Sequence, residues 1–184
     1  MTLQPTLTTP RLIIRPFRPE DAPDIKRLLD DPIIAATTAR IPHPYELENA
    51  NQFIAEITVE FDSGRGITCA ITIRSTGELI GVVSLRIESY WERAELGYWI
   101  GVSHWSNGFA TEAAAAMVEY GFRNLGLNRL YAWFFPDNPA SGRVLEKIGM
   151  QREGLARQHL KKSDGFKDAV LMGLLRQEWE HNAR

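Results

Sequence analysis

The sequence predicts a mixed α/β fold in a single domain. Three observations predict it: apolar and polar residues alternate in several short segments, longer segments between them carry apolar residues at helical spacing, and pairs of strands joined by tight turns stand near both ends. A chain of 184 residues fits one domain and buries about 70% of the surface that its unfolded form exposes. We therefore expect one domain over residues 1–184, without an internal repeat or a linker.

The first third of the chain predicts a strand followed by two helices. Residues 11–17 form a short β-rich run that contains a proline, which favours an edge strand. Residues 19–31 begin with a proline and two acidic side chains, carry an apolar stripe and stop just before Pro32, as a helix would. A proline-rich loop at 41–45 precedes residues 50–61, whose apolar side chains again have helical spacing.

The remaining elements alternate between strands and helices. Asn138 suits a helix N-cap, Pro139 suits the first helical position, and Gly149 suits the left-handed residue after the helix end. The expected strands cover residues 67–73, 79–87, 94–102, 129–135, 151–160 and 167–175, and the expected helices begin near residues 110 and 139.

The chain is organised around residues 95–119, which read as a strand, a glycine-containing turn and a helix. Residues 106–108 break the alternating strand with turn chemistry, and strong helix formers follow from Ala110. Such a helix presents free backbone N–H groups and a positive dipole end, which favours a bound phosphate. The turn lacks both the Gly-Lys-Ser/Thr ending of a nucleoside triphosphate loop and the G-x-G-x-x-G pattern. One side of the strand carries Leu96, Tyr98, Ile100 and Val102, and the other carries Glu95, Gly97, Trp99 and Gly101.

The turn itself, Trp105-Ser106-Asn107-Gly108-Phe109-Ala110 followed by Thr111-Glu112-Ala113, resembles the pyrophosphate loop of the GNAT N-acetyltransferases. That loop usually reads Gln/Arg-x-x-Gly-x-Gly/Ala. The local string looks most like the RimJ/RimL-type branch, which acetylates protein N-termini. Trp105 stands where the wider superfamily has Gln or Arg, and the RimJ-like branch commonly has Trp at this position.

The resemblance covers nearly the whole chain, because further motifs follow in the family's order. They are Thr9-x-Arg11-Leu12-x-x-Arg15, Pro42 to Tyr45, Asn138-x-x-Ser141-x-x-x-Leu145-x-Lys147-x-Gly149, and Gly165-x-x-Asp168 with Glu178-Trp179. The resemblance implies the GNAT fold: a mixed twisted sheet of about seven strands that splays between strands 4 and 5, flanked by about four helices. The fourth strand is about Ala94 to Val102, and the fifth is about Arg129 to Phe134.

The resemblance also implies acetyl-CoA as cosubstrate. Pantetheine would pair with the exposed edge of the fourth strand, which includes Ile100 and Val102, as an added strand would. The backbone N–H groups of Asn107, Gly108, Phe109, Ala110 and Thr111 would hold the pyrophosphate, and Asn138 and Arg143 would add contacts. Lys147 reads as solvated, and Glu112 reads as a carboxylate that interacts with the dipole of its helix.

Acetyl transfer needs a neutral amine, a polarised thioester carbonyl and a proton for the leaving thiolate. Glu95 is the candidate base; the alternative is a solvated strand residue or one paired with Arg93 or Arg86. Ser141 is the candidate proton donor, and the alternative is a first-turn serine that serves its own helix. Cys69 alternates with isoleucines on a strand and reads as core.

Composition argues against several other classes of protein. The net charge of −2 does not suggest binding to nucleic acid or to an anionic membrane, and a single cysteine excludes an internal disulfide. The first residues show no secretory signal, and no apolar run reaches about 20 residues. His43 reads as a surface residue, and no cluster has metal-ligand spacing. We expect a cytoplasmic protein without a metal, as a monomer or homodimer.

The resemblance implies an acetyl-CoA-dependent N-acetyltransferase, and the candidate residues fit direct attack in a ternary complex. At pH 7 roughly 10% of a protein α-amine is neutral, against about 0.04% of a lysine side chain, so the modest base here favours an α-amine acceptor, such as that of a ribosomal protein. Two alternatives stay open: a small amine such as a polyamine, amino acid or antibiotic, and a non-catalytic module that binds acyl-CoA.

Overall fold

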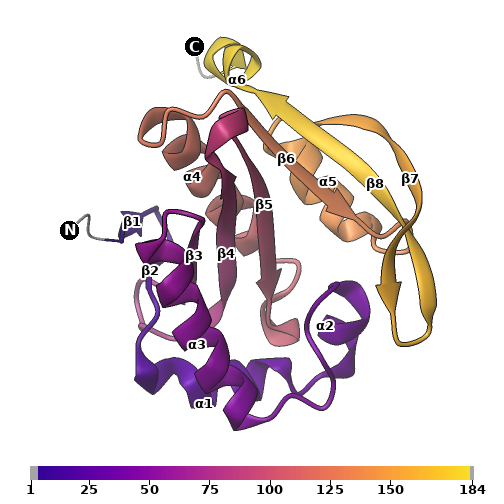
Figure 1. The fold of residues 1–184 in the computed structure, drawn as a ribbon. Helices are drawn as coiled ribbons and strands as arrows, with labels where there is room; N and C mark the ends of the chain where they lie inside the picture. The colour runs from indigo at the N-terminus through magenta and orange to yellow at the C-terminus, as the bar shows by residue number, and fades with distance from the viewer. Residues whose placement is uncertain (1–3, 183–184) are drawn as a thin grey trace.

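The computed structural model describes residues 4–182. Residues 1–3, which belong to the N-terminal segment predicted to lack a secretory signal, and residues 183–184 lie outside this range. Within this range eight strands form: β1 (Leu7–Thr8), β2 (Leu12–Pro16), β3 (Gly66–Ile73), β4 (Leu79–Glu88), β5 (Arg93–Ile100), β6 (Arg129–Phe134), β7 (Gln151–Lys162) and β8 (Gly165–Leu175) (Figure 1). The α-helices of the same range are α1 (Ala22–Leu29), α2 (Pro32–Thr37), α3 (Leu47–Asp62), α4 (Phe109–Arg123), α5 (Pro139–Lys147) and α6 (Arg176–Asn182). The predicted mixed α/β class is confirmed.

The strands form one open sheet in the order β1-β2-β3-β4-β5-β6-β8-β7. Every neighbouring pair is antiparallel except β5 and β6, which run parallel. These two strands pair only over Arg93–Glu95 and Arg129–Tyr131. Figure 1 shows them close together at one end and separating toward the other. The splay predicted between strands 4 and 5 therefore lies between β5 and β6, since the short β1 shifts the count by one.

Helices cover both faces of the sheet, and β3 shows how the sequence directs this. Successive strand residues point to opposite faces. Cys69 and Ile71 join the cluster formed with α4, whereas Ala70 joins a second cluster with residues of α1 and α3. The strand is therefore buried on both sides, which explains its nearly continuous apolar sequence.

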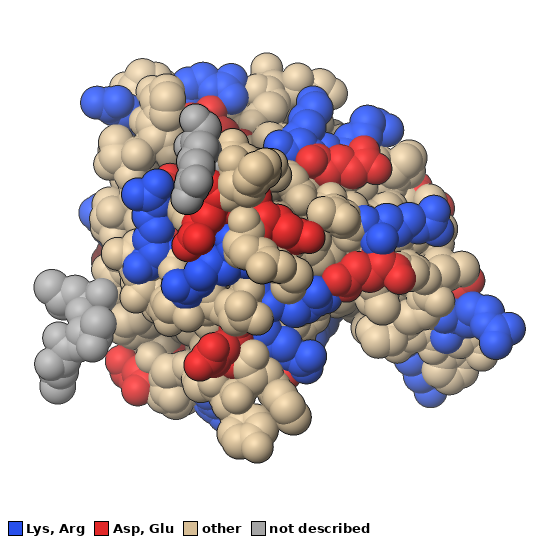
Figure 2. All heavy atoms as spheres, turned by 90° about the horizontal axis from the view of Figure 1, so that it is seen from above, with Lys and Arg blue, Asp and Glu red and all other residues tan. Residues whose placement is uncertain are grey.

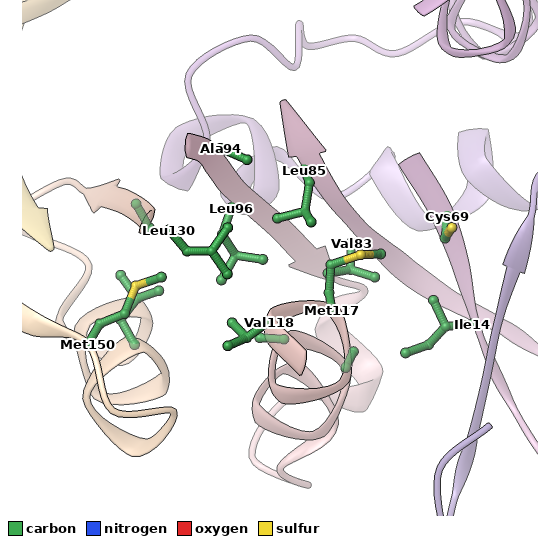
Figure 3. Close-up of a cluster of buried hydrophobic side chains, with 14 of the residues drawn as sticks. Ile14, Cys69, Val83, Leu85, Ala94, Leu96, Met117, Val118, Leu130 and Met150 are labelled. Atoms are coloured by element: carbon green, nitrogen blue, oxygen red, sulfur yellow. The ribbon is translucent and has the colours of Figure 1, made fainter. Parts of the chain in front are cut away.

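The larger cluster lies between α4 and the central strands (Figure 3). Met117 of α4 is fully buried there with Leu85 of β4 and Leu130 of β6. Gly121 lets the helix approach closely, because a Cβ at this position would lie 3.2 Å from the Leu85 side chain. Cys69 is also fully buried, and burial raises the pKa of its thiol to about 12. The core role predicted for Cys69 is confirmed.

Three parts of the sequence-based prediction need correction. Residues 11–17 do not form the edge of the sheet, because β1 pairs with β2 outside them. Helix α2 was not predicted, since residues 32–40 were assigned to no element; Asp31 caps it by accepting a hydrogen bond from the Ile33 N–H (3.0 Å). The same Asp-Pro step that ends one helix therefore starts the next, and α2 is too short to show a periodic stripe. The C-terminal helix α6 was not predicted as an element.

Basic and acidic side chains are interspersed on the face that Figure 2 shows. Among residues 4–182, no helix has both the length and the apolar character that a membrane crossing requires.

We expect Gly81→Ala to lower the free energy of unfolding by about 2 kcal/mol, because the added methyl group overpacks the sheet. A Cβ at Gly81 would lie 2.3 Å from the Trp99 carbonyl oxygen and 2.8 Å from the Ile100 side chain. The first of these is a backbone atom of β5 and cannot move without disturbing the strand. Denaturant unfolding measures the change. Gly154→Ala is the control, since no atom lies within 4 Å of its Cβ position; equal stability of the two variants would contradict the prediction.

Candidate active site

The parting of β5 and β6 opens a cleft with a volume of about 1010 Å³. Beyond Glu95, the edge of β5 that faces β6 has no strand beside it, because the β5–β6 register ends there. The other edge of β5 stays paired with β4 as far as Ile100. Besides β5 and β6, residues of α2 and α3, of the loop before α4 and of the start of α5 line the cleft. An extended ligand can therefore lie along β5.

The loop before α4 adopts the expected conformation of a helix start. Gly108 is the N-cap residue of α4 and has φ +77°, in the left-handed region where a side chain is disfavoured. The indole N–H of Trp105 donates to the Ile100 carbonyl (2.7 Å) and so attaches the loop to the end of β5. The first turn of α4 lines the cleft, and its N–H groups have no intrahelical acceptor. This end of the cleft suits a phosphate group.

Seven of the nine predicted cofactor-binding residues line the cleft: Ile100, Gly108, Phe109, Ala110, Thr111, Asn138 and Arg143. Asn107 lies outside the lining: its side-chain amide donates to the carbonyls of His104 (3.2 Å) and Trp105 (3.0 Å). Val102 lies outside it too. The strand ends at Ile100, and Val102 begins a 3₁₀ turn in which its side chain packs against the cluster of α1 and α3. The prediction that Val102 lies on the strand edge was therefore wrong. Val102 is apolar because its side chain packs under those helices.

Glu95 lies where β5 and β6 part, and its side chain lines the cleft with 19% of its surface exposed. Its carboxylate accepts a hydrogen bond from the indole N–H of Trp133 on β6 (3.0 Å). Arg86 lies 4.0 Å from the other oxygen, at the limit of an ion pair, while Arg93 binds Glu88 instead (2.7 Å). Within residues 4–182 that second oxygen accepts no hydrogen bond. The contact between Trp133 and Glu95 was not predicted, because no local pattern in the sequence relates the two residues.

Ser141 lies in the first turn of α5 and lines the cleft. Asn138 caps this helix, and its side-chain oxygen accepts from the Ser141 N–H (3.3 Å), as predicted. The Ser141 hydroxyl lies 2.9 Å from the phenol oxygen of Tyr98, and either oxygen can be the donor; the phenol can instead donate to the Ser141 carbonyl (3.1 Å). Burial raises the pKa of Tyr98 well above its ordinary value, although its hydrogen bond with Ser141 opposes the shift. Tyr98 therefore stays protonated and able to donate.

Sequence analysis also missed Tyr98 as a site residue. Its alternation with Leu96 and Ile100 indicated a core position, and the ring does pack against the large cluster. The alternation gave no sign that the phenol reaches α5 across the cleft.

Arg143 and Lys147 are exposed on α5 and both line the cleft, whereas a cofactor contact was expected for Arg143 alone. His43 is exposed in the loop before α3, as predicted. Within residues 4–182 no group of three His, Cys, Asp or Glu side chains is arranged to hold a metal ion.

A contact between β7 and the end of α2 lies next to residues that line the cleft. The Lys162 ammonium at the end of β7 donates to the backbone carbonyls of Ala35, Ala36 and Thr38, around the C-terminus of α2. It thereby joins two segments more than 120 residues apart in the sequence. Cations are favourable at helix C-termini, so this contact holds α2 in place beside the cleft.

Since the sequence predicts acetyl-CoA as the ligand of this cleft, we expect Tyr98→Phe to lower kcat about fivefold with little change in the KM for acetyl-CoA, because one hydrogen bond that holds Ser141 is worth about 1 kcal/mol. Steady-state kinetics of Tyr98→Phe, Ser141→Ala and the double variant measure this. Since the two hydroxyls touch, the losses should not add. Fully additive losses would show that Tyr98 acts independently of Ser141.

Comparisons with known proteins agree with this geometry. Residues 11–151 match the family model described as an acetyltransferase (GNAT) domain. The uncharacterized N-acetyltransferase YoaA of Bacillus subtilis is 38% identical over 157 residues, which cover 85% of this chain and 88% of that protein. The [ribosomal protein uS5]-alanine N-acetyltransferase of Escherichia coli is 31% identical over 104 residues, 55% of this chain and 54% of that protein.

Solved structures share the fold. RimJ of Mycobacterium smegmatis, in complex with a CoA disulfide, superposes with a TM-score of 0.80 at 21% identity, covering 94% of this chain and 90% of that one. The splayed sheet, the helix start at its cleft and these matches lead to one conclusion. The chain belongs to the GNAT acetyltransferases, a family of acyltransferase enzymes, and within that family it resembles the RimJ/RimL-type N-acetyltransferases.

Proposed function

We propose that this chain transfers the acetyl group of acetyl-CoA to the α-amine of a protein N-terminus, of the kind that a ribosomal protein carries. The proposal rests on the three-residue pairing of β5 with β6, which ends at Glu95 and opens the cleft there. The N-terminus of α4 then lines one part of a continuous cleft, and the Glu95 carboxylate lies where β5 and β6 part.

The groups along the cleft match the parts of acetyl-CoA. The N–H groups of Gly108–Thr111 would hold the diphosphate at the positive end of α4. The unpaired edge of Leu96–Ile100 offers alternating N–H and C=O groups, which the two amides of pantetheine would use as an added strand does. Ser141 and Glu95 then stand near the end where the thioester would lie.

Acetyl-CoA supplies an activated acetyl group as a thioester, so the chain's residues have to manage the protons. Glu95 accepts a proton from the ammonium of the acceptor, directly or through one water molecule. The neutral amine attacks the thioester carbonyl, the C–S bond breaks, and the Ser141 hydroxyl, held by Tyr98, donates a hydrogen bond to the departing sulfur. The second proton that the nitrogen loses as the amide forms passes through solvent to the thiolate, which leaves as the thiol of CoA. The Cys69 thiol is fully buried, so an acyl-enzyme on Cys69 is not part of the proposal. Holding both substrates together supplies the entropic advantage of direct transfer.

The acceptor is proposed on two grounds. An α-amine has a pKa near 7.8 and is neutral far more often at pH 7 than a lysine amine, so a carboxylate is a sufficient base. The matched Escherichia coli protein is named as an alanine N-acetyltransferase of ribosomal protein uS5, and the only amine that an alanine can carry is an α-amine. Both point to a chain end rather than to a side chain.

Acetyl transfer to a panel of acceptors tests the proposal. The panel contains peptides with free N-termini, the same peptides with blocked N-termini and an internal lysine, polyamines and free amino acids. We expect CoA release and a mass increase of one acetyl group only on the free N-terminal peptides. Faster turnover of polyamines or amino acids would replace the proposed acceptor with a small amine. Binding of acetyl-CoA without turnover on any acceptor would favour a non-catalytic module.

A further inference from the structure

Arg11, in the turn that leads into β2, lies against the loop that begins α4. Its Nε donates to Glu112 Oε2 (2.6 Å), and one terminal nitrogen donates to the Asn107 carbonyl (2.9 Å). The guanidinium also lies 4.7 Å from the centre of the Phe109 ring. Arg11 therefore contacts the Asn107 carbonyl in the loop and two side chains in the first turn of α4, those of Phe109 and Glu112.

Glu112 fixes the position of this arginine. Its carboxylate accepts hydrogen bonds from the Thr9 hydroxyl (2.6 Å), the Arg11 N–H (2.9 Å) and the Arg11 side chain. Burial raises the pKa of Glu112, but these hydrogen bonds and the charge of Arg11 outweigh it, and the pKa is lower than usual. The carboxylate therefore stays charged. It does more than interact with the helix dipole, because it joins α4 to a segment 100 residues earlier in the chain.

Arg11 stands behind the loop rather than in the cleft. It lines a separate surface hollow of about 540 Å³ with Arg74 and Phe109, and it is not part of the cleft lining. A ligand in the cleft would meet the loop from the opposite side.

We propose that Arg11 is a positioning residue for the diphosphate of acetyl-CoA, an inference that rests on the proposed function of the cleft. A trans peptide unit is planar, and its C=O and N–H point in opposite directions. Because the Asn107 carbonyl points to Arg11, the N–H of Gly108 in the same peptide unit points away from it, and Gly108 lines the cleft. Arg11 thus holds one loop donor in the direction of the ligand.

Charge adds to this role. Residues 105–111 contain no Lys or Arg. Arg11 brings a guanidinium to the loop from a distant part of the chain. Both effects act only on a ligand that carries the diphosphate, so they should vanish with a donor that ends at pantetheine.

The test compares acetyl-CoA with S-acetylpantetheine, which has the thioester and the pantetheine amides but no diphosphate. We expect Arg11→Gln to raise the KM for acetyl-CoA about tenfold, the effect of losing one hydrogen bond to a charged group, with kcat within twofold. Its kcat/KM with S-acetylpantetheine should equal that of the parent chain. Arg74→Gln, which removes an exposed arginine from the same hollow, is the control and should change neither donor.

Calorimetric titration with CoA makes the test independent of turnover. Arg11→Gln should raise the Kd for CoA about tenfold, whether or not any acceptor is acetylated. A failure of the proposed acceptor can therefore be told apart from a failure of the proposed role of Arg11. Arg11→Lys is a second variant in case Arg11→Gln folds poorly: it keeps the charge but cannot bind Glu112 and the Asn107 carbonyl through two separate nitrogens, so it should also raise the KM for acetyl-CoA and leave that for S-acetylpantetheine unchanged. An unchanged Kd for CoA would overturn the proposal, and so would equal losses with both donors, which would reveal a merely structural role.

Discussion

Replacing Glu95 with glutamine is expected to lower kcat for acetyl transfer about a hundredfold, at the lower end of what a general base contributes. Glutamine keeps an oxygen that can accept from Trp133, so the position of the side chain where β5 and β6 part should be preserved. It removes only the ability to take a proton. The KM for acetyl-CoA should change little, because Glu95 lies at the opposite end of the cleft from the α4 N-terminus.

Steady-state kinetics with a saturating N-terminal peptide measure this change. Glu92→Gln is a matched control, since Glu92 is exposed in the turn just before β5. We expect Glu92→Gln to retain the kcat of the parent chain. If Glu95→Gln does the same, Glu95 is only a paired strand residue, and its assignment as the base fails.

The second large effect concerns stability. We expect Asp21→Asn to lower the free energy of unfolding by about 3–5 kcal/mol, because it leaves the guanidinium of Arg15 without its counter-charge in a nearly buried site. Arg15 contacts both carboxylate oxygens of Asp21 (2.7 and 2.8 Å), and the Arg18 N–H donates to the same carboxylate (2.8 Å). The two side chains are only 15% and 9% exposed. The pair attaches the start of α1 to β2.

Stability should also depend on pH through Asp21. Burial raises the pKa of its carboxyl, but the hydrogen bonds from Arg15 and Arg18 outweigh burial, and the pKa in the folded chain is lowered. The group therefore contributes stability above its unfolded pKa of about 3.9, and this contribution is lost as the pH falls through the folded pKa. Denaturant unfolding of the parent chain from pH 7 to pH 3 should show the loss at the acid end, and Asp21→Asn should lack that part of it.

Asp24→Asn is the control on the same helix. Asp24 pairs with Arg27 at the surface, where both side chains are about half exposed, and such pairs contribute about 0.2–1 kcal/mol. Equal destabilisation by the two substitutions would contradict a special role for the Arg15–Asp21 pair.

Local signals in the sequence were sufficient to predict the parts of the site that are built locally. The Asn138 cap, the glycine at position 108 and the helix that follows it depend on residues within a few positions of one another. The left-handed Gly149 was predicted for the same reason. Hairpins were predictable because alternation and turn residues stand side by side.

Contacts between distant segments were not predictable in this way. Tyr98 meets Ser141, Trp133 meets Glu95, and Arg11 meets Glu112 across 38 to 101 residues. Period-two patterning tells which face of a strand a side chain occupies, but not which partner stands opposite. The splay itself came from the family resemblance, since it depends on where the β5–β6 register stops.

The most direct measurement is a crystal structure of the chain with CoA. We expect the diphosphate oxygens within hydrogen-bond distance of the backbone N–H groups of Gly108–Thr111, pantetheine along the free edge of β5, and the sulfur near Ser141 and Glu95. CoA bound elsewhere on the molecule, or in the cleft with its diphosphate away from the start of α4, would contradict the assignment of this cleft as the acetyl-CoA site.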